Sequence, residues 1–302
     1  MKNFLIVIVL STIISIFYFF PDCKHWRCTK IKIEGYKLYQ SFLEKKNGIN
    51  DCNIPNINTI SKNSILIIGH AYGKKNNTFI GEEDFLDRRI MDIIQKEKEN
   101  IDLVIFNGDV FYEPSKKKWS SLINFFRDMD IGLYIAPGNH DIKLYNNEEF
   151  SKDLFVKFFD LEYPKILNLN GFNLVIRDTI NMGWSPEEKE ISLIYSMIKE
   201  KNLIIIQHHT AFNDLRFLTN DIAINRSEAN NQILNLDTFI ESFGEKKKLT
   251  FLIGDAGLHD HQKRIECKSK HNLEYIINGL GGHIDDKILV IDKEYIYSYN
   301  LI

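Results

Sequence analysis

The chain has 302 residues, of which 44% are hydrophobic and 26% are charged, and its formal net charge at pH 7 is −3. This composition is ordinary for a globular protein that can bury a sizeable core. The weakly negative charge provides no basic field, so we expect no nucleic-acid partner. Apart from a hydrophobic terminal segment, the length allows one large domain or two small ones.

The first predicted element is a hydrophobic segment, Phe4–Phe20, which follows Lys2 and ends at Pro21. Its length is at the lower limit for a membrane-spanning helix and slightly above that of a signal-peptide core. No small-x-small cleavage site follows it. We therefore predict that residues 1–21 are an uncleaved N-terminal transmembrane anchor rather than a cleaved signal segment.

The orientation of this anchor has two interpretations. Four basic residues lie shortly after the segment, and the positive-inside rule would then place the rest of the chain in the cytoplasm. A very short N-terminus with a single lysine is instead typical of a signal anchor that exports the remainder of the chain. We favour the second interpretation, a membrane protein with an extracytoplasmic domain.

The cysteines leave the compartment open. There are four of them, Cys23, Cys28, Cys52 and Cys267, and no pair has the CxxC spacing of a zinc knuckle. An even number permits two disulfides in an oxidising compartment. Buried or idle thiols are the alternative.

Residues 22–60 are polar and only weakly periodic, and we interpret them as a juxtamembrane connector before a domain that spans residues 61–302. From Ser64 onward, short apolar runs predict strands that are buried on both faces. These runs are Ile65–Ile68, Leu103–Phe106, Gly132–Ala136, Asn173–Ile176, Leu203–Ile206 and Leu249–Ile253.

Amphipathic stretches with helical spacing lie between several of these runs. They are Phe85–Lys96, Lys118–Asp128 and Glu187–Lys199. The alternation of strand and helix predicts an α/β fold with a largely parallel sheet. The tail, Tyr275–Ile302, is more typical of short strands joined by turns.

Residues with metal-binding side chains come directly after five of the predicted strands. In such sheets, ligands bind where loops leave the carboxyl ends of the strands. The residues are His70, Asp109, Asn139 with His140 and Asp141, His208 with His209, and Asp255. Each has an ordinary structural explanation by itself, but together they predict a divalent-cation site with oxygen and nitrogen ligands.

At these residues the chain resembles the calcineurin-like metallophosphoesterases. Gly108-Asp109 and Gly138-Asn139-His140-Asp141 match two motifs of that family in order, and His208 matches a single-histidine ligand position. The resemblance covers about residues 64–302. It implies a four-layer α/β/β/α sandwich, one or two divalent metal ions (Mn, Fe, Zn or Mg), and a phosphorylated substrate. It also implies that Asp109 bridges the metals and that His140 acts on the substrate.

The first and last family motifs are altered. Asp-x-His is replaced by His70-Ala71-Tyr72, and Gly-His-x-His is replaced by Gly254-Asp255-Ala256-Gly257. The resemblance implies that one metal position keeps four ligands, namely Asp109, Asn139, His208 and Asp255. The other position would keep Asp109 and His70, whereas Gly257 has no ligand atom and Tyr72 binds metal well only as a phenolate.

Four further residues have open roles. Tyr112 has the spacing from Asp109 at which purple acid phosphatases place an iron-binding tyrosine, and a packed aromatic ring is the alternative. His259 and His261 are candidate replacements for the missing imidazoles. His209 is a candidate phosphate contact or a structural residue.

These residues support two predicted functions. The first is hydrolysis of a phosphomonoester or phosphodiester by metal-activated water. The second is a degenerate family member that binds metal or a phosphorylated ligand without turnover. A membrane-tethered interaction module without metal is a third alternative.

Overall fold

The computed structural model describes residues 48–74, 76–81, 84–142, 155, 162–169, 171–180, 182–183, 186–197, 202–211, 248–255, 265–293 and 295–301. The chain divides into two units, Met1–Asn50 and Asp51–Ile302. Only residues 48–50 of the first unit are described, so the predicted anchor Phe4–Phe20 lies outside the described residues. No helix in the described part of the chain is long and apolar enough to cross a membrane.

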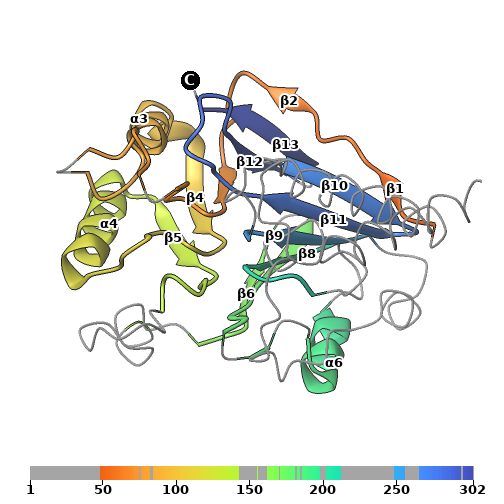
Figure 1. Cartoon of the computed structure of the whole chain (residues 1–302). Helices are drawn as coiled ribbons and strands as arrows, with labels where there is room; N and C mark the ends of the chain where they lie inside the picture. The colour runs from red at the N-terminus through yellow and green to blue at the C-terminus, as the bar shows by residue number, and fades with distance from the viewer. Residues whose placement is uncertain are drawn as a thin grey trace, which may run out of the picture. The chain divides into compact units, whose positions relative to one another are not determined.

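Two mixed β-sheets form the centre of the second unit (Figure 1). One sheet runs in the order β1 (Asn50–Asp51), β10 (Ile265–Lys270), β11 (Leu273–Asn278), β9 (Leu249–Ile253), β8 (Asn202–Gln207), β7 (Phe172–Ile176) and β6 (Lys165–Asn168). The other runs in the order β2 (Asn56–Ile57), β13 (Tyr295–Asn300), β12 (Lys287–Asp292), β3 (Ser64–Ile68), β4 (Ile101–Phe106) and β5 (Gly132–Ile135).

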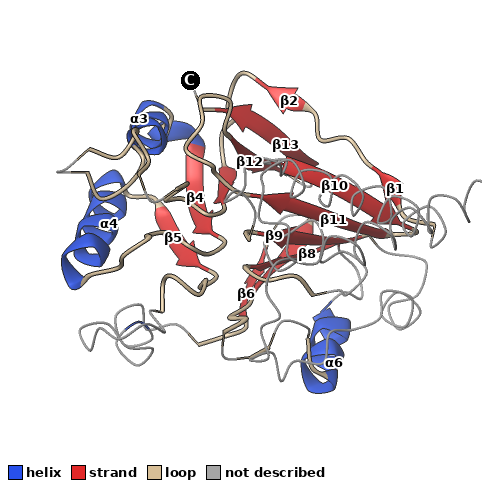
Figure 2. Ribbon diagram, in the orientation of Figure 1, coloured by secondary structure: helices blue, strands red, loops and turns tan. Residues whose placement is uncertain are grey.

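The parallel strands lie together in each sheet. In the six-stranded sheet, β3, β4 and β5 are parallel, and in the seven-stranded sheet β11, β9, β8 and β7 are parallel. Antiparallel neighbours such as β10, β6 and β12 complete the sheets. The described helices are α3 (Arg88–Lys96), a 3-10 turn (Lys98–Asn100), α4 (Lys116–Met129) and α6 (Glu188–Met197) (Figure 2).

All six strands and all three helices predicted from the apolar runs are present, with boundaries shifted by a few residues. The sequence did not predict β1, β2, β6 or β10. These strands are short or polar and occupy edge or next-to-edge positions, so they lack the continuous apolar run that marks a central strand. β2 pairs with β13, and both strands belong to the compact unit Asp51–Ile302.

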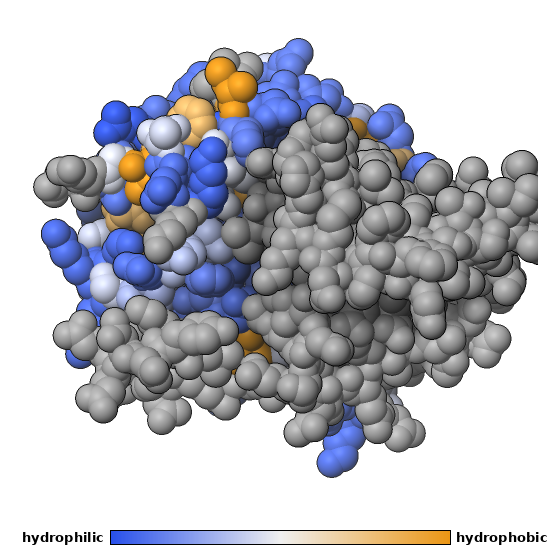
Figure 3. Space-filling model, in the orientation of Figure 1, coloured by the Kyte–Doolittle hydropathy of each residue, from blue (hydrophilic) through white to orange (hydrophobic). Residues whose placement is uncertain are grey.

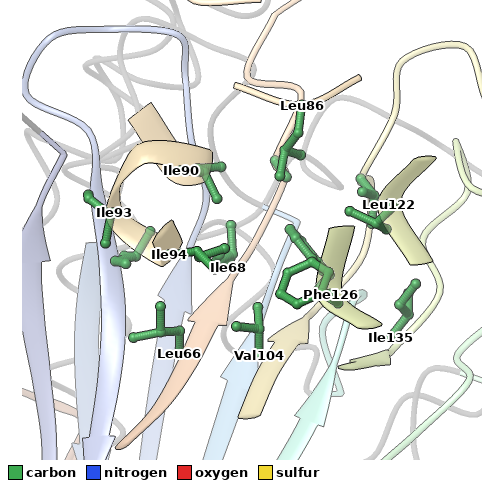
Figure 4. Packing of buried hydrophobic residues seen from close by; sticks show 14 of the residues in the cluster. Leu66, Ile68, Leu86, Ile90, Ile93, Ile94, Val104, Leu122, Phe126 and Ile135 are labelled. Carbon is green, nitrogen blue, oxygen red and sulfur yellow. The ribbon is translucent and has the colours of Figure 1, made fainter. Parts of the chain in front are cut away.

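The main strands are apolar on both faces because each face has a different partner. Ile65 and Ile67 of β3 pack in the cluster that joins the two sheets. Leu66 and Ile68 of the same strand pack in the cluster that joins the sheet to α3 and α4 (Figure 4). This alternation has the period of two that a strand requires, and it explains why the sequence shows uninterrupted apolar runs.

The two helices that pack on the six-stranded sheet, α3 and α4, both begin at a capping side chain. Asp87 accepts a hydrogen bond from the Arg89 amide at the start of α3, and Ser115 accepts one from the Lys118 amide at the start of α4. The Arg89 side chain is buried and also binds the Asp87 and Asp286 carboxylates. It thereby connects α3 to the loop that precedes β12.

The outer face of the seven-stranded sheet faces α6. Arg177, directly after β7, donates hydrogen bonds to Glu190 of α6 and to Gln207 at the end of β8. Gln207 alternates with Ile206, which lies between the sheets, and so it points outward. Helices therefore flank two stacked sheets, which confirms the predicted α/β class.

Cys52 and Cys267 form a disulfide, whereas Cys23 and Cys28 lie outside the described residues. The surface of the described residues visible in Figure 3 is mainly hydrophilic with small, separate hydrophobic spots. Large exposed apolar side chains in the described part are Leu193, Ile284 and Tyr295.

Candidate metal centre

The strand-end loops of the two sheets meet at one place. His70 follows β3 and Asp109 follows β4 in the six-stranded sheet, while His208 follows β8 and Asp255 follows β9 in the other. The imidazole Nε2 of His208 lies 3.5 Å from Asp109 Oδ1 and 3.9 Å from Asp255 Oδ1. On the other side, His70 Nε2 lies 3.8 Å from Asp109 Oδ2.

These separations are too long for hydrogen bonds and are close to the spacing of two ligands on one ion. Metal–ligand bonds of about 2.1 Å place neighbouring ligand atoms about 3.0 to 3.5 Å apart. The two oxygens of Asp109 face different histidines, as expected for a carboxylate that bridges two ion positions. His70 therefore lies beside the Asp109 oxygen that faces away from His208.

The tautomers of both histidines favour metal binding. His208 Nδ1 lies 3.2 Å from the Asn107 carbonyl oxygen, and His70 Nδ1 lies 3.1 Å from the Leu280 carbonyl oxygen. A carbonyl oxygen only accepts, so Nδ1 carries the proton and Nε2 presents a lone pair. Both Nε2 atoms are buried and have no hydrogen-bond partner among the described residues. A cation between each Nε2 and the Asp109 oxygen that it faces would satisfy both nitrogens.

The charges at the centre also suit a cation. Burial lowers the pKa of His70 to about 4, against an opposing influence of Asp109, so this imidazole is neutral at pH 7. Burial alone would raise the pKa of Asp109, but the surrounding histidines, His208 foremost, lower it overall. Asp109 is therefore ionised, although only 1% of its surface is exposed.

Two glycines allow the loops to approach one another. A Cβ at Gly108, whose φ is +97°, would lie 2.1 Å from His208 Nδ1, and a Cβ at Gly138 would lie 2.3 Å from Asp109 Oδ1. His70 and Asp109 themselves have left-handed backbones with φ of 48° and 56°. Such conformations are costly in non-glycine residues and concentrate at functional sites.

His140 lies beside Asp109. Its amide donates to Asp109 Oδ1 at 3.0 Å, and its Nδ1 lies 3.1 Å from the Tyr112 carbonyl oxygen. The same tautomer argument leaves His140 Nε2 for another partner. Asn139 is half-buried in the same loop, between two residues that contact Asp109. Its role as a ligand stays a prediction, as do the other ligand assignments.

Asp141 has a structural role that the motif alone did not reveal. Its carboxylate accepts hydrogen bonds from the amides of Asp109, Val110 and Gly138 at 2.8 to 2.9 Å. It thereby fixes the loop after β4 against the loop after β5. The sequence offered a signal, since an acidic residue closes the Gly-Asn-His-Asp run, but two of its three partners, Asp109 and Val110, lie in another loop.

His209 belongs to a second cluster of possible ligands. Donor atoms of His208, His209 and Asp255 all lie within 4.8 Å of one another, and all three residues are buried. The His209 Nδ1 is 2.8 Å from the hydroxyl of Thr179, which follows β7. The loop of Thr179 was not among the predicted site loops, although it also leaves a strand end. We regard the atoms around Asp109 as the better-defined centre, because there two unpartnered nitrogens face one carboxylate.

The tyrosines line the centre. The Tyr72 ring is 4.2 Å from the His70 ring, and burial together with Asp109 and Asp255 raises its pKa above the usual range. Its neutral hydroxyl has no partner among the described residues. Tyr112 stacks on His140 with ring centroids 5.2 Å apart. The candidate replacements His259 and His261, and also Gly257, lie outside the described residues.

The chain is similar in sequence to a known protein family. Residues 80–232, about half of the chain, match the calcineurin-like phosphoesterase family. A "Probable cyclic nucleotide phosphodiesterase" of Vesicomyosocius okutanii subsp. Calyptogena okutanii (strain HA) is 29% identical over 112 residues, 36% of this chain and 46% of that protein. The chain thus spans less than half the length of this relative.

Solved structures show more distant similarity. A purple acid phosphatase from yellow lupin (Lupinus luteus) seeds is 12% identical with a TM-score of 0.47, over 82% of this chain and 55% of that one. The phosphopantetheinyl hydrolase of Mycobacterium tuberculosis is 9% identical with a TM-score of 0.41, over 74% and 92%. The family match carries the assignment. The chain belongs to the calcineurin-like phosphoesterases, as its motifs predicted.

Proposed function

We propose that this protein is a metal-dependent phosphoester hydrolase whose centre is built on Asp109. The observation that carries the proposal is the pair of buried, unpartnered Nε2 atoms of His70 and His208 that face the two oxygens of this carboxylate. A bound divalent ion would supply hydroxide near neutral pH and neutralise charge on the phosphoryl oxygens.

The residues of the chain would have separate roles in holding metal and in catalysis. Asp109, His208 and Asp255 would hold one ion, with Asn139 in the adjoining loop. Asp109 and His70 would contribute to a second position. His140, fixed by the Tyr112 carbonyl, would place its Nε2 toward the leaving oxygen and stabilise or protonate it.

The experiment is hydrolysis of p-nitrophenyl phosphate and bis-p-nitrophenyl phosphate by purified protein loaded with Mn, Fe, Zn or Mg. We expect activity that depends on metal and is lost in His140→Ala with the metal content retained. Metal content is measured by elemental analysis. Folded protein that contains metal but hydrolyses neither substrate would favour the alternative, a family member that binds without turnover.

We also propose that the domain faces an oxidising compartment, as the export orientation predicts. The Cys52–Cys267 disulfide supports this, because structural disulfides persist mainly outside the cytosol. Thiol labelling of protein from intact cells tests it. Labelling of both cysteines without prior reduction would refute the proposal.

A further inference from the structure

A pocket of about 260 Å³ lies between the loop after β3 and the loop after β4. Tyr72 and Tyr112 form part of its wall. Their rings also contact the metal centre, since Tyr72 packs against His70 and His140, and Tyr112 stacks on His140. A phosphoester held at the centre would therefore have this pocket beside it, available for the alcohol part of the substrate.

The charges that line the pocket are unbalanced. Lys74 and Lys118 contribute two positive charges, and Asp84 and Glu113 contribute two negative ones. Asp84 is neutralised by Arg88, whose Nη2 lies 2.9 Å from its carboxylate. Among the described residues that line the pocket, Glu113 therefore remains against two lysines, which leaves one positive charge in excess.

Neither lysine has a carboxylate within 4.0 Å among the described residues. Lys118 is half-buried and donates to the Glu113 backbone carbonyl at 3.0 Å, so two of its three N–H donors remain for a ligand. Burial lowers the pKa of Lys118, because its ammonium has lost part of its hydration. An ammonium in this state gains more from an incoming anion than one that is fully in water.

We propose that this pocket binds a second anionic group on the substrate, such as a carboxylate, through Lys74 and Lys118. The substrate class is then a phosphoester whose alcohol part carries its own negative charge. This inference rests on the proposed function, since it takes the scissile phosphate to be held at Asp109.

A matched pair of substrates tests it: 4-carboxyphenyl phosphate and the neutral, similarly sized 4-carbamoylphenyl phosphate. We expect wild-type kcat/KM to favour the carboxylate substrate by about tenfold, the size of one well-placed ion pair. The double variant Lys74→Met/Lys118→Met should reduce this ratio to about one. Lys117→Met is the matched control, because Lys117 is exposed on the same helix and does not line the pocket. Equal kcat/KM for the two substrates in the wild type, or an unchanged ratio in the double variant, would overturn the inference.

Binding separates this inference from the proposed function. The corresponding non-hydrolysable benzylphosphonates are titrated calorimetrically into metal-loaded protein. If neither phosphate is hydrolysed, the proposed function fails, but a tenfold preference for the carboxylated phosphonate that disappears in the double variant still supports the pocket. Equal binding of both phosphonates, or binding of neither, refutes it.

Discussion

Replacing Asp109 by asparagine should stabilise the metal-free protein and abolish its stabilisation by metal. In the wild type, an ionised carboxylate with 1% exposure faces imidazole lone pairs at 3.5 and 3.8 Å. Without a cation, this buried charge lacks full compensation. Asparagine keeps an acceptor for the His140 amide and can direct an N–H at one of the two imidazoles.

The magnitude can be worked out from these contacts. One new buried hydrogen bond increases the free energy of unfolding by about 1 kcal/mol. Removal of the buried charge increases it further, whereas the hydrogen bond from the His140 amide becomes weaker and decreases it. In the metal-free state, we expect the free energy of unfolding of Asp109→Asn to exceed that of the wild type by about 1 to 3 kcal/mol. For a unit of this size that corresponds to an increase in Tm of about 3 to 10 °C.

Thermal unfolding at pH 8, in chelator and in excess Mn or Zn, measures both effects. At 1,000 times the Kd, metal should stabilise the wild type by about 4.1 kcal/mol and Asp109→Asn by much less, so the wild type becomes the more stable of the two proteins. A variant that is less stable than the wild type in chelator would refute the reasoning. Equal shifts of both proteins on adding metal would do the same.

Three further substitutions test the surroundings of the centre. Gly108→Ala should lower the free energy of unfolding by about 2 to 4 kcal/mol and reduce metal content, because its Cβ meets His208 at a positive φ; unchanged metal content would contradict the close approach. Asp141→Asn should destabilise by about 1 to 3 kcal/mol in urea unfolding, since one of its three amide donors must then face an N–H group; a stability equal to wild type would remove its assigned role. Arg89→Leu should lower the free energy of unfolding by about 3 to 5 kcal/mol, because it leaves two buried aspartates uncompensated. Arg89→Lys should lower it by less, and an equal loss in the two variants would argue against a charge effect.

The sequence by itself determined the central strands and three helices, and it indicated which strand-end residues would lie near one another. This was possible because strands buried on both faces produce continuous apolar runs, and because the carboxyl ends of parallel strands share one edge. His70, Asp109, His208 and Asp255 could therefore be expected near one another before their distances were known. Strands at or next to a sheet edge, such as β10, were not predicted, because their polar side chains interrupt the continuous apolar run.

Only the tertiary structure decided which atoms the residues of the altered motifs face. The sequence could show that His70 replaces an aspartate, but not that its Nε2 faces the second oxygen of Asp109 while Leu280, far along the chain, fixes its tautomer. The roles of Asp141 and Thr179 likewise depend on partners in other loops. Hydrogen bonds of this kind act across space rather than along the chain, so no local pattern records them.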